Sequence, residues 1–285
     1  MEERKTRRTK HHRGRRGKKK TKNLISNIII VIAAAVFVYA AFNLWNIFQE
    51  YQKGTNEYDD IQNIVVSVQS IDEEGEEVGF EVDFEKLKEM NQDTVAWIRF
   101  EEPSEINYPV VLGIDNEKYL NTTFEGNPNA AGTLFIDMSN REDFSDRNTF
   151  IYGHNMKNGS MFGKLKKYRS SDFYKENPYF YIYTPDGKES TYQIFSVTVV
   201  KDTSDSYTKH FFDDAEYEEY LANIQSLSLY QTGVEVNKDS KIVSLSTCTN
   251  VSDDERLLVH GVKISEKGKA TLLSTYRSWR IVGKR

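Results

Sequence analysis

The amino-acid sequence predicts a mainly β domain with added helices, in the α+β class, behind an N-terminal segment that spans a membrane. From residue 95 onward, short runs rich in β-branched and aromatic residues are separated at close intervals by turn sequences, as in a barrel or sandwich. Residues 213–229 interrupt this pattern with apolar residues at helical spacing. Near the N-terminus, residues 23–49 contain no charged side chain.

The N-terminal region combines a basic arm with an apolar stretch. Residues 1–22 hold twelve Lys or Arg and two Glu, a balance of +10, so the remainder of the chain sums to −15. A basic arm alone is compatible with nucleic-acid binding. Here it abuts residues 24–45, which as a helix would span roughly 33 Å and cross a bilayer. The arm is then cytoplasmic and the acidic remainder outside. A cleaved signal peptide is the alternative, but this apolar region is long for one and no convincing cleavage site ends it.

These features divide the chain into five segments. Residues 1–22 form the basic cytoplasmic arm, 23–49 the transmembrane anchor, 50–82 a stalk, 83–265 the β domain and 266–285 a basic tail. In the stalk, Ile61, Ile64, Val65 and Val68 have helical spacing. Asp83 is a predicted N-cap for a short helix over residues 84–90, with Leu87 as its core contact.

The β domain is predicted from eight runs and one helix. The strands are expected at residues 95–100, 108–112, 132–136, 149–152, 179–183, 191–200, 242–248 and 256–260. The helix is expected at residues 213–229, with an apolar stripe made of Tyr217, Tyr220, Leu221, Ile224 and Leu227.

Cys248 is the only cysteine in the chain. Alternation places Ser244, Ser246 and Cys248 on one face of a strand, and Arg256 and His260 on one face of the next. The polar loop between them can return the chain to an adjacent position, which would place the thiol beside the guanidinium. A lone cysteine outside the membrane forms no internal disulfide and does not suit a four-ligand zinc site. A buried structural cysteine is the alternative to a reactive one.

His154 is the candidate partner of this thiol. It follows a strand-like run at residues 148–152 and opens a loop rich in Gly and Asn. A free thiol has a pKa of about 8.5 and needs a base or a charge partner to act as a nucleophile near neutral pH. An arginine can stabilise the oxyanion that develops during acyl transfer. Spacing alone does not bring His154 to Cys248; only the fold can.

With these residues in view, the sequence resembles the sortases, and class B sortases most closely. The resemblance covers residues 83–264 and depends first on Ser244-Leu-Ser-Thr-Cys248, Arg256 and Asn148-Thr-Phe-Ile-Tyr-Gly-His-Asn-Met156. The supporting segments are Ala96-Trp-Ile98, Tyr108-Pro-Val-Val111, Asp115-Asn116, Tyr119-Leu120, Ala131-Gly132 and Phe135-Ile-Asp137.

This resemblance implies a fold and an activity. The fold would be an eight-stranded β-barrel with N-terminal helices and a helical insertion, here residues 213–229, between late strands. Sortases are membrane-anchored cysteine transpeptidases of mainly Gram-positive bacteria, so Cys248 would be the nucleophile, His154 its partner, and Arg256 the substrate and oxyanion ligand. The partners would be surface proteins with a C-terminal sorting motif, of the Asn-Pro-x-Thr type in class B, and a peptidoglycan precursor or cross-bridge amine.

Other conspicuous residues have two readings each. Asn155, Ser246 and Thr247 are candidate substrate-binding residues, or they satisfy local backbone groups. His260 is expected to be a hydrogen-bonded histidine of the barrel. The acidic run at residues 253–255 is expected to be a solvated loop rather than a group that tunes Arg256.

The remaining alternatives concern function. No phosphate loop, metal-ligand cluster or dinucleotide fingerprint occurs in the sequence, so we expect no cofactor, no metal and no nucleic acid. Two rival functions use the same fold. A membrane-anchored cysteine peptidase would deliver the acyl group to water, whereas a non-catalytic wall-binding scaffold would keep Cys248 as a core residue.

Overall fold

The computed structural model describes residues 16–68 and 79–268. Most of the predicted basic arm and the predicted tail beyond residue 268 lie outside these ranges. The chain divides into two compact units, with the boundary between Gln49 and Glu50. The elements are α1 (Arg16–Val65), β1 (Val66–Val68), β2 (Phe80–Val82), α2 (Phe84–Met90), β3 (Thr94–Arg99), β4 (Asn107–Val111), β5 (Leu134–Ile136), β6 (Asn148–Tyr152), η1 (Leu165–Arg169), α3 (Ser171–Glu176), β7 (Tyr179–Tyr183), β8 (Lys188–Lys201), η2 (Asp205–Tyr207), α4 (Asp214–Ser226), β9 (Ile242–Cys248) and β10 (Glu255–Gly268).

The first unit contains the apolar part of α1. Its large side chains between Ile28 and Phe48 are exposed, with Phe37 and Tyr39 at 73% and 70%. The helix is long and apolar enough to cross a membrane. An uncharged helical segment with this much exposed apolar surface is unfavourable in water, so this part of α1 is a candidate membrane span.

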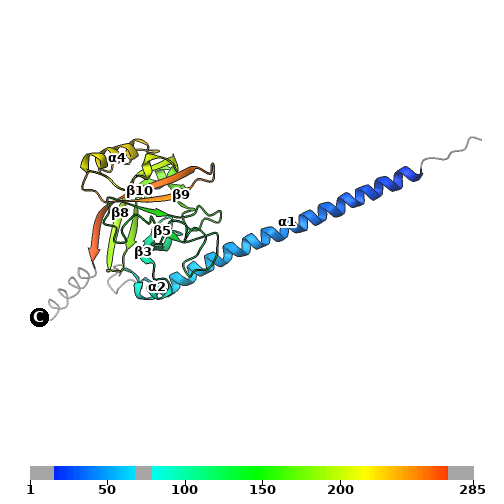
Figure 1. Cartoon of the computed structure of the whole chain (residues 1–285), viewed down its shortest axis with the longest axis horizontal. Helices are drawn as coiled ribbons and strands as arrows, with labels where there is room; N and C mark the ends of the chain where they lie inside the picture. Colours follow the sequence, from blue (N-terminus) through cyan, green and yellow to red (C-terminus); the bar gives the residue numbers. More distant parts are fainter. Residues whose placement is uncertain (1–15, 69–78, 269–285) are drawn as a thin grey trace, which may run out of the picture. The chain divides into compact units, whose positions relative to one another are not determined.

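The second unit is built on a closed barrel of eight strands, in the order β10-β8-β7-β3-β4-β5-β6-β9. The predicted eight-stranded barrel is thus confirmed. Most neighbouring strands are antiparallel, but β4 pairs with β5 and β6 pairs with β9 in parallel. In the view of Figure 1, α2 (cyan) and α4 (yellow) lie at opposite sides of the barrel.

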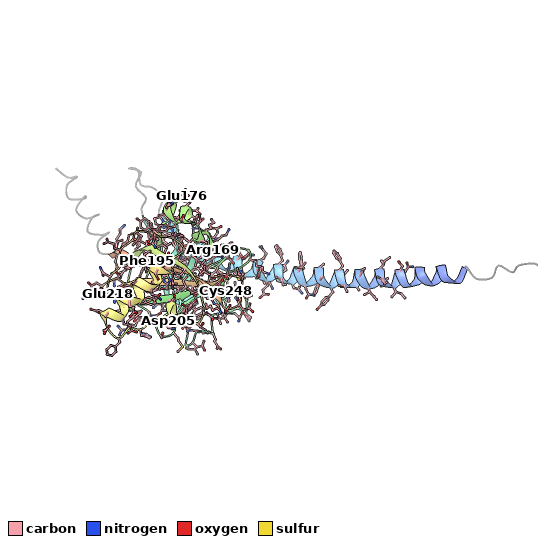
Figure 2. All side chains as sticks on the ribbon, turned by 90° about the horizontal axis from the view of Figure 1, so that it is seen from above. Arg169, Glu176, Phe195, Asp205, Glu218 and Cys248 are labelled. Carbon is pink, nitrogen blue, oxygen red and sulfur yellow. The ribbon has the colours of Figure 1, made fainter. Side chains whose placement is uncertain are left out.

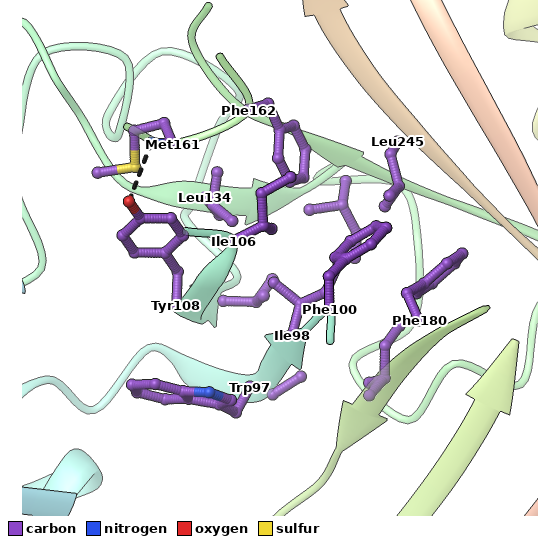
Figure 3. Close-up of a cluster of buried hydrophobic side chains, with 14 of the residues drawn as sticks. Trp97, Ile98, Phe100, Ile106, Tyr108, Leu134, Met161, Phe162, Phe180 and Leu245 are labelled. Atoms are coloured by element: carbon purple, nitrogen blue, oxygen red, sulfur yellow. Dashed lines mark hydrogen bonds between the residues drawn. The ribbon is translucent and has the colours of Figure 1, made fainter. Parts of the chain in front are cut away.

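The barrel interior is filled by large apolar side chains from β3, β4 and β7 and from the loops that follow β6 (Figure 3). Phe100 and Phe180 are almost fully buried and stack at 5.2 Å between ring centroids, whereas the buried Trp97 lies on the opposite face of β3 from Ile98 (Figure 3). The Trp97 indole N–H donates to Asn107 Oδ1 at 2.6 Å, which satisfies the polar atom of a buried ring. The Tyr108 hydroxyl accepts a hydrogen bond from the Met161 N–H, drawn as the dashed line in Figure 3.

The final turns of α1 belong to the barrel unit, and they differ in part from the sequence prediction. Tyr58, Ile61 and Val65 are buried in the main core, whereas Ile64 is 53% exposed. The buried positions are three and four residues apart, so Ile64, one residue before Val65, is turned about 100° away from the packed face. Of the four apolar residues noted for their helical spacing, Ile61 and Val65 are therefore the ones that pack from this helix. The helix also ends at Val65, because Val66–Val68 pairs with Phe80–Val82 as a two-stranded sheet that the sequence analysis did not predict.

Short helix α2 follows its prediction closely. Asp83 Oδ1 accepts a hydrogen bond from the Lys86 N–H at 3.1 Å, so the predicted N-cap is confirmed. Leu87 is fully buried, as predicted.

Helix α4 packs against the barrel through Tyr217, Tyr220, Leu221 and Ile224. These side chains form a second apolar cluster with residues of β8, β9 and β10. The predicted fifth member, Leu227, is 44% exposed, so that part of the stripe prediction was wrong. The helix ends at Ser226, and its apolar stripe ends one turn earlier than the sequence pattern suggests.

Strand boundaries differ mainly at the two longest strands. β8 begins at Lys188 and β10 continues to Gly268, where they pair over most of their length. The predicted border at residue 265 therefore falls inside β10. The short helices η1 and α3, between β6 and β7, were not predicted, because each is too short to show a helical period.

Candidate active site

The thiol and the guanidinium are neighbours across two antiparallel strands. Cys248 is the last residue of β9 (Figure 2), and Arg256 is the second residue of β10. The register pairs Arg256 directly with Cys248, so their side chains project from the same face of the sheet. The loop at residues 249–254 connects the two strands, as the sequence analysis expected.

His154 reaches the same end of the barrel because β6 runs parallel to β9. Tyr152 pairs with Ser246, and the Gly153 N–H donates to the Ser246 carbonyl at 3.1 Å. The chain leaves β6 here, so His154 lies beside the last residues of β9. The parallel pairing is the feature that brings a histidine distant in sequence to the thiol.

Gly153 has a packing role at this exit. A Cβ atom at position 153 would lie 2.3 Å from a methyl carbon of Leu134 and 2.7 Å from the Phe162 ring. Both side chains belong to the buried cluster of Figure 3. Only glycine allows the backbone to pass this close to the core, and this close passage determines the position of the His154 backbone.

A cavity of about 240 Å³ lies at this end of the barrel. Five of the six predicted site residues line it: His154, Ser246, Thr247, Cys248 and Arg256. The other lining residues were not predicted as site residues, although all except Thr133 lie in the segments that carry the resemblance; they are Asn116, Leu120, Thr133, Phe135, Tyr152 and Gly153.

Asn155, the sixth predicted residue, makes a backbone contact. Its Nδ2 group donates to the carbonyl oxygen of Cys248 at 2.7 Å. It therefore ties the loop after β6 to the residue that carries the thiol, which is the local backbone role weighed in the sequence analysis.

The imidazole of His154 is held by one backbone group. Its Nε2 atom lies 2.7 Å from the carbonyl oxygen of Leu120. A carbonyl oxygen can only accept, so Nε2 carries the proton of this hydrogen bond. Nδ1 is then the ring atom left to exchange a proton with a reacting group.

The guanidinium of Arg256 is held at several points. Nη1 donates to the carbonyl oxygens of Asp253 at 2.6 Å and Glu255 at 3.2 Å, and Nη2 pairs with Asp202 Oδ2 at 3.3 Å. The acidic run thus offers its backbone to Arg256, while the carboxylate partner comes from the residue after β8. These contacts fix the plane of the guanidinium beside the thiol.

Ser246 is in contact with a tyrosine that the sequence analysis did not identify. The Tyr207 hydroxyl lies 2.7 Å from Ser246 Oγ, and its ring stacks on Phe150 at 5.3 Å. Burial raises the pKa of Tyr207 to about 12, so its hydroxyl stays protonated. Thr247 Oγ1 is buried and has no partner among the residues that the structure describes.

A buried carboxylate supports one wall of the cavity. Asp137 Oδ2 accepts hydrogen bonds from Asn116 Nδ2, the Tyr152 hydroxyl and Lys209 Nζ, at 3.1, 3.0 and 2.8 Å. Burial would raise the pKa of Asp137, but the hydrogen bonds from Lys209 and Ser139 outweigh it and lower the pKa to about 2. The ionised carboxylate therefore links two cavity residues to the loop between β8 and α4.

His260 lies within the barrel wall. It is fully buried, and its Nδ1 lies 2.8 Å from Ser244 Oγ, which donates onward to Asn148 Oδ1 at 2.8 Å. Since the Ser244 hydroxyl donates its proton to Asn148, Nδ1 of His260 must be the donor to Ser244 Oγ. Burial lowers the pKa of His260 to about 3. This agrees with the expectation of a hydrogen-bonded barrel histidine.

The fold and the cavity together define a class of protein. A closed mixed barrel with a thiol, an imidazole and an immobilised guanidinium at one end holds the groups that acyl transfer through a cysteine nucleophile requires.

Comparison with known proteins identifies the family. The sortase domain model matches residues 102–264. Sortase B of Listeria monocytogenes is 34% identical over 184 residues, covering 63% of this chain and 73% of that protein. Sortase B of Staphylococcus aureus is 33% identical over 184 residues, covering 64% and 74%. The crystal structure of sortase B from B. anthracis in complex with AAEK1 is 33% identical with a TM-score of 0.66, covering 76% of this chain and 99% of that one. The chain belongs to the sortase family, in class B.

Proposed function

We propose that this chain is a membrane-anchored sortase that joins surface proteins to the cell wall. Residues 1–22 would be cytoplasmic, 23–49 would cross the bilayer, 50–82 would connect to the barrel, 83–265 would form the catalytic domain outside the cell, and 266–285 would be a tail. The exposed apolar helix supports the anchor. The excess of Lys and Arg before it supports a cytoplasmic N-terminus.

The observation that carries the assignment of roles is that Cys248, His154 and Arg256 line one cavity, with Cys248 and Arg256 paired across β9 and β10. Cys248 is the nucleophile, His154 moves the proton, and Arg256 stabilises the oxyanion and holds the substrate backbone. Ser246 and Thr247 face the bound peptide. Asn155 is kept as a substrate-binding candidate that also holds the Cys248 carbonyl.

The reaction proceeds in two balanced halves. The Cys248 thiol first passes its proton to Nδ1 of His154, the thiolate attacks the carbonyl carbon of the threonine in the sorting motif, and Arg256 stabilises the oxyanion. The C–N bond breaks as His154 gives a proton to the leaving amine, which leaves a thioacyl-enzyme. An amine of a peptidoglycan precursor or cross-bridge then attacks the thioester carbonyl and gives a proton to His154. The Cys248 thiolate leaves, and a new amide has formed.

Intact-mass spectrometry of the full chain in detergent micelles tests this proposal. We expect a peptide of the Asn-Pro-x-Thr type to add an acyl mass to Cys248, and an added glycine-peptide or diaminopimelate amine to discharge it as a new amide. The Cys248→Ala variant is the matched control and should stay at its own mass. Discharge to water regardless of amine would indicate a peptidase. A thiol that neither acylates nor reacts with iodoacetamide would indicate a scaffold.

A further inference from the structure

The barrel-facing part of α1, residues 50–65, contacts a loop that carries part of the cavity. This loop, residues 119–133, contributes Leu120 and Thr133 to the lining. Its ends are held together by hydrogen bonds from the Thr133 N–H to the Tyr119 carbonyl at 3.0 Å and from Thr133 Oγ1 to the Thr122 carbonyl at 2.8 Å. It is therefore one closed unit rather than a free connection, and its carbonyl at Leu120 is the group that holds His154.

Two acidic residues of α1 bind the outer part of the loop. Glu57 accepts hydrogen bonds from Thr123 Oγ1 at 2.9 Å, the Glu125 N–H at 3.1 Å and Asn127 Nδ2 at 3.1 Å. Glu50 accepts from Asn129 Nδ2 through its carbonyl and from the Ala130 N–H through its carboxylate, at 2.9 and 3.0 Å. Hydrogen bonds to charged groups are stronger than neutral ones, so these contacts fix the loop on the helix.

Tyr58 connects the helix to the inner end of the loop. Its side chain is 3% exposed, and its hydroxyl lies 2.5 Å from the Gly132 carbonyl and 3.1 Å from Thr133 Oγ1. Gly132 has a φ of 58°, and a Cβ there would lie 2.7 Å from the Leu120 carbonyl oxygen. The residue held by Tyr58 is thus packed directly against the carbonyl that binds His154.

Gly54 explains how the helix comes so close. A glycine inside a helix costs about 1 kcal/mol relative to alanine, so its presence calls for a reason. A Cβ at position 54 would lie 3.1 Å from Asn129 Oδ1 and 3.4 Å from the Ala131 Cβ. The missing side chain lets α1 lie against the loop, which is the arrangement that the Glu50, Glu57 and Tyr58 contacts require.

From these contacts we propose that residues 50–65 of α1 position the catalytic histidine: they hold the loop at residues 119–133 so that the Leu120 carbonyl keeps His154 protonated on Nε2. Tyr58 and Glu57 are then positioning residues that act through this loop. The inference rests on the proposed role of His154 in the proton transfers. The helical segment that follows the proposed anchor would thus help to determine which ring nitrogen of His154 carries the proton.

The tautomer of His154 provides a readout that needs no turnover. Nitrogen NMR of the full chain in detergent micelles, labelled with ¹⁵N-histidine, distinguishes protonated from unprotonated ring nitrogens. The chain has five histidines, and a His154→Gln variant identifies the signals of interest. In the unaltered chain near neutral pH we expect the neutral form of His154 to be protonated on Nε2.

We expect Tyr58→Phe and Glu57→Ala to give a mixture of the two His154 tautomers. They should lower kcat by about 10- to 100-fold, the scale for misplacing a catalytic group by about 1 Å, while KM changes by about twofold or less. Asp60→Ala is the matched control, because it removes a carboxylate from an exposed position of the same helix, and it should change neither readout. Gly54→Ala, which increases helix propensity but crowds Asn129, is the second route if Tyr58→Phe does not fold.

The outcomes separate this inference from the proposed function. If His154 keeps its Nε2 proton in Tyr58→Phe, Glu57→Ala and Gly54→Ala, the inference is refuted. Normal peptide transfer in the same variants would leave the proposed function intact. A tautomer change confined to these variants would support it, even if the peptide chosen is never transferred. Loss that falls on KM alone would also refute it, because it would place the helix in peptide binding.

Discussion

Replacing Arg256 with lysine separates a catalytic guanidinium from a structural one. In the structure, Nη1 of Arg256 donates to the Asp253 and Glu255 carbonyls and Nη2 pairs with Asp202, with 22% of the side chain exposed. A lysine keeps the positive charge but offers a mobile point charge in place of a rigid plane of donors. It cannot hold those contacts and face the substrate carbonyl at the same time.

The two roles predict different magnitudes. Loss of one oxyanion donor costs about 10²–10³ in kcat, or about 2.7–4 kcal/mol of transition-state stabilisation. As a purely structural group, Arg256 contributes about 0.5–1.5 kcal/mol through each backbone hydrogen bond, and about 0–1 kcal/mol through the part-exposed pair with Asp202. The catalytic role therefore predicts a large loss in kcat even when the variant is fully folded. The structural role alone predicts a modest loss of stability and a near-normal kcat as long as the protein stays folded.

Steady-state kinetics and urea unfolding of the same preparations measure both quantities. We expect Arg256→Lys to lose about 10²–10³ in kcat with little change in KM, since the contact strengthens in the transition state. Asp202→Asn is the control: it removes the carboxylate partner and leaves the guanidinium, so kcat should change by less than about tenfold. Activity within a few-fold of the unaltered enzyme in both Arg256→Lys and Arg256→Ala would remove Arg256 from the reaction.

Three further changes test the packing and electrostatics of the barrel. Ile224→Asp places a charge in a fully buried contact and should cost several kcal/mol in urea unfolding, whereas Leu227→Asp, at a 44% exposed position, should stay within about 0.5 kcal/mol; equal losses would contradict the packing described for α4. Asp137→Asn should cost about 3 kcal/mol and slow transfer, because it leaves the Lys209 charge without its buried partner. The double variant with Lys209→Met should recover part of that stability, and an additive loss would show that the pair is not coupled. The pKa of His260 is about 3 in the folded protein and about 6.5 in the unfolded chain, so the unfolded chain binds a proton that the folded protein does not. The free energy of unfolding should therefore fall as the pH drops from 6.5 to 3, by about 2 kcal/mol at pH 5. His260→Gln should flatten that dependence in acid unfolding curves, and an unchanged slope would refute it.

Much of the fold was predictable because its strands alternate and its turns are marked. The runs around Trp97, Tyr108 and Ile182 show strand patterns without any tertiary information. The pairing of Cys248 with Arg256 was predictable for a related reason, since two adjacent strands joined by a short loop form a hairpin. Errors arose where a helical pattern continued past the helix that carries it, as at Leu227 beyond α4 and at Val68 beyond α1.

The rest of the site depends on contacts that leave no local pattern. Nothing around Asp137 or Lys209 indicates that they meet, because they are 72 residues apart and belong to different loops. Tyr207 lies in a single turn of 3₁₀ helix, too short to have a period. The partner of His154 is the main-chain carbonyl of Leu120, and every residue has one. The only local signal was Gly153 beside the histidine, since a glycine at a strand exit often marks a close backbone approach.

The parallel pairing of β6 and β9 determines when during folding the site can form. Asn155 and Cys248 are in contact although 93 residues separate them, and six strand or helix elements of the barrel unit lie between. Contacts of such high sequence separation form slowly, because the entropy of closing the loop must be overcome before they stabilise anything. During synthesis from the N-terminus, β6 is therefore made well before β9 and β10, which carry the thiol and the guanidinium. Until β9 docks beside β6, the thiol lacks its imidazole partner, so the nascent chain should carry a cysteine without its base until the barrel closes.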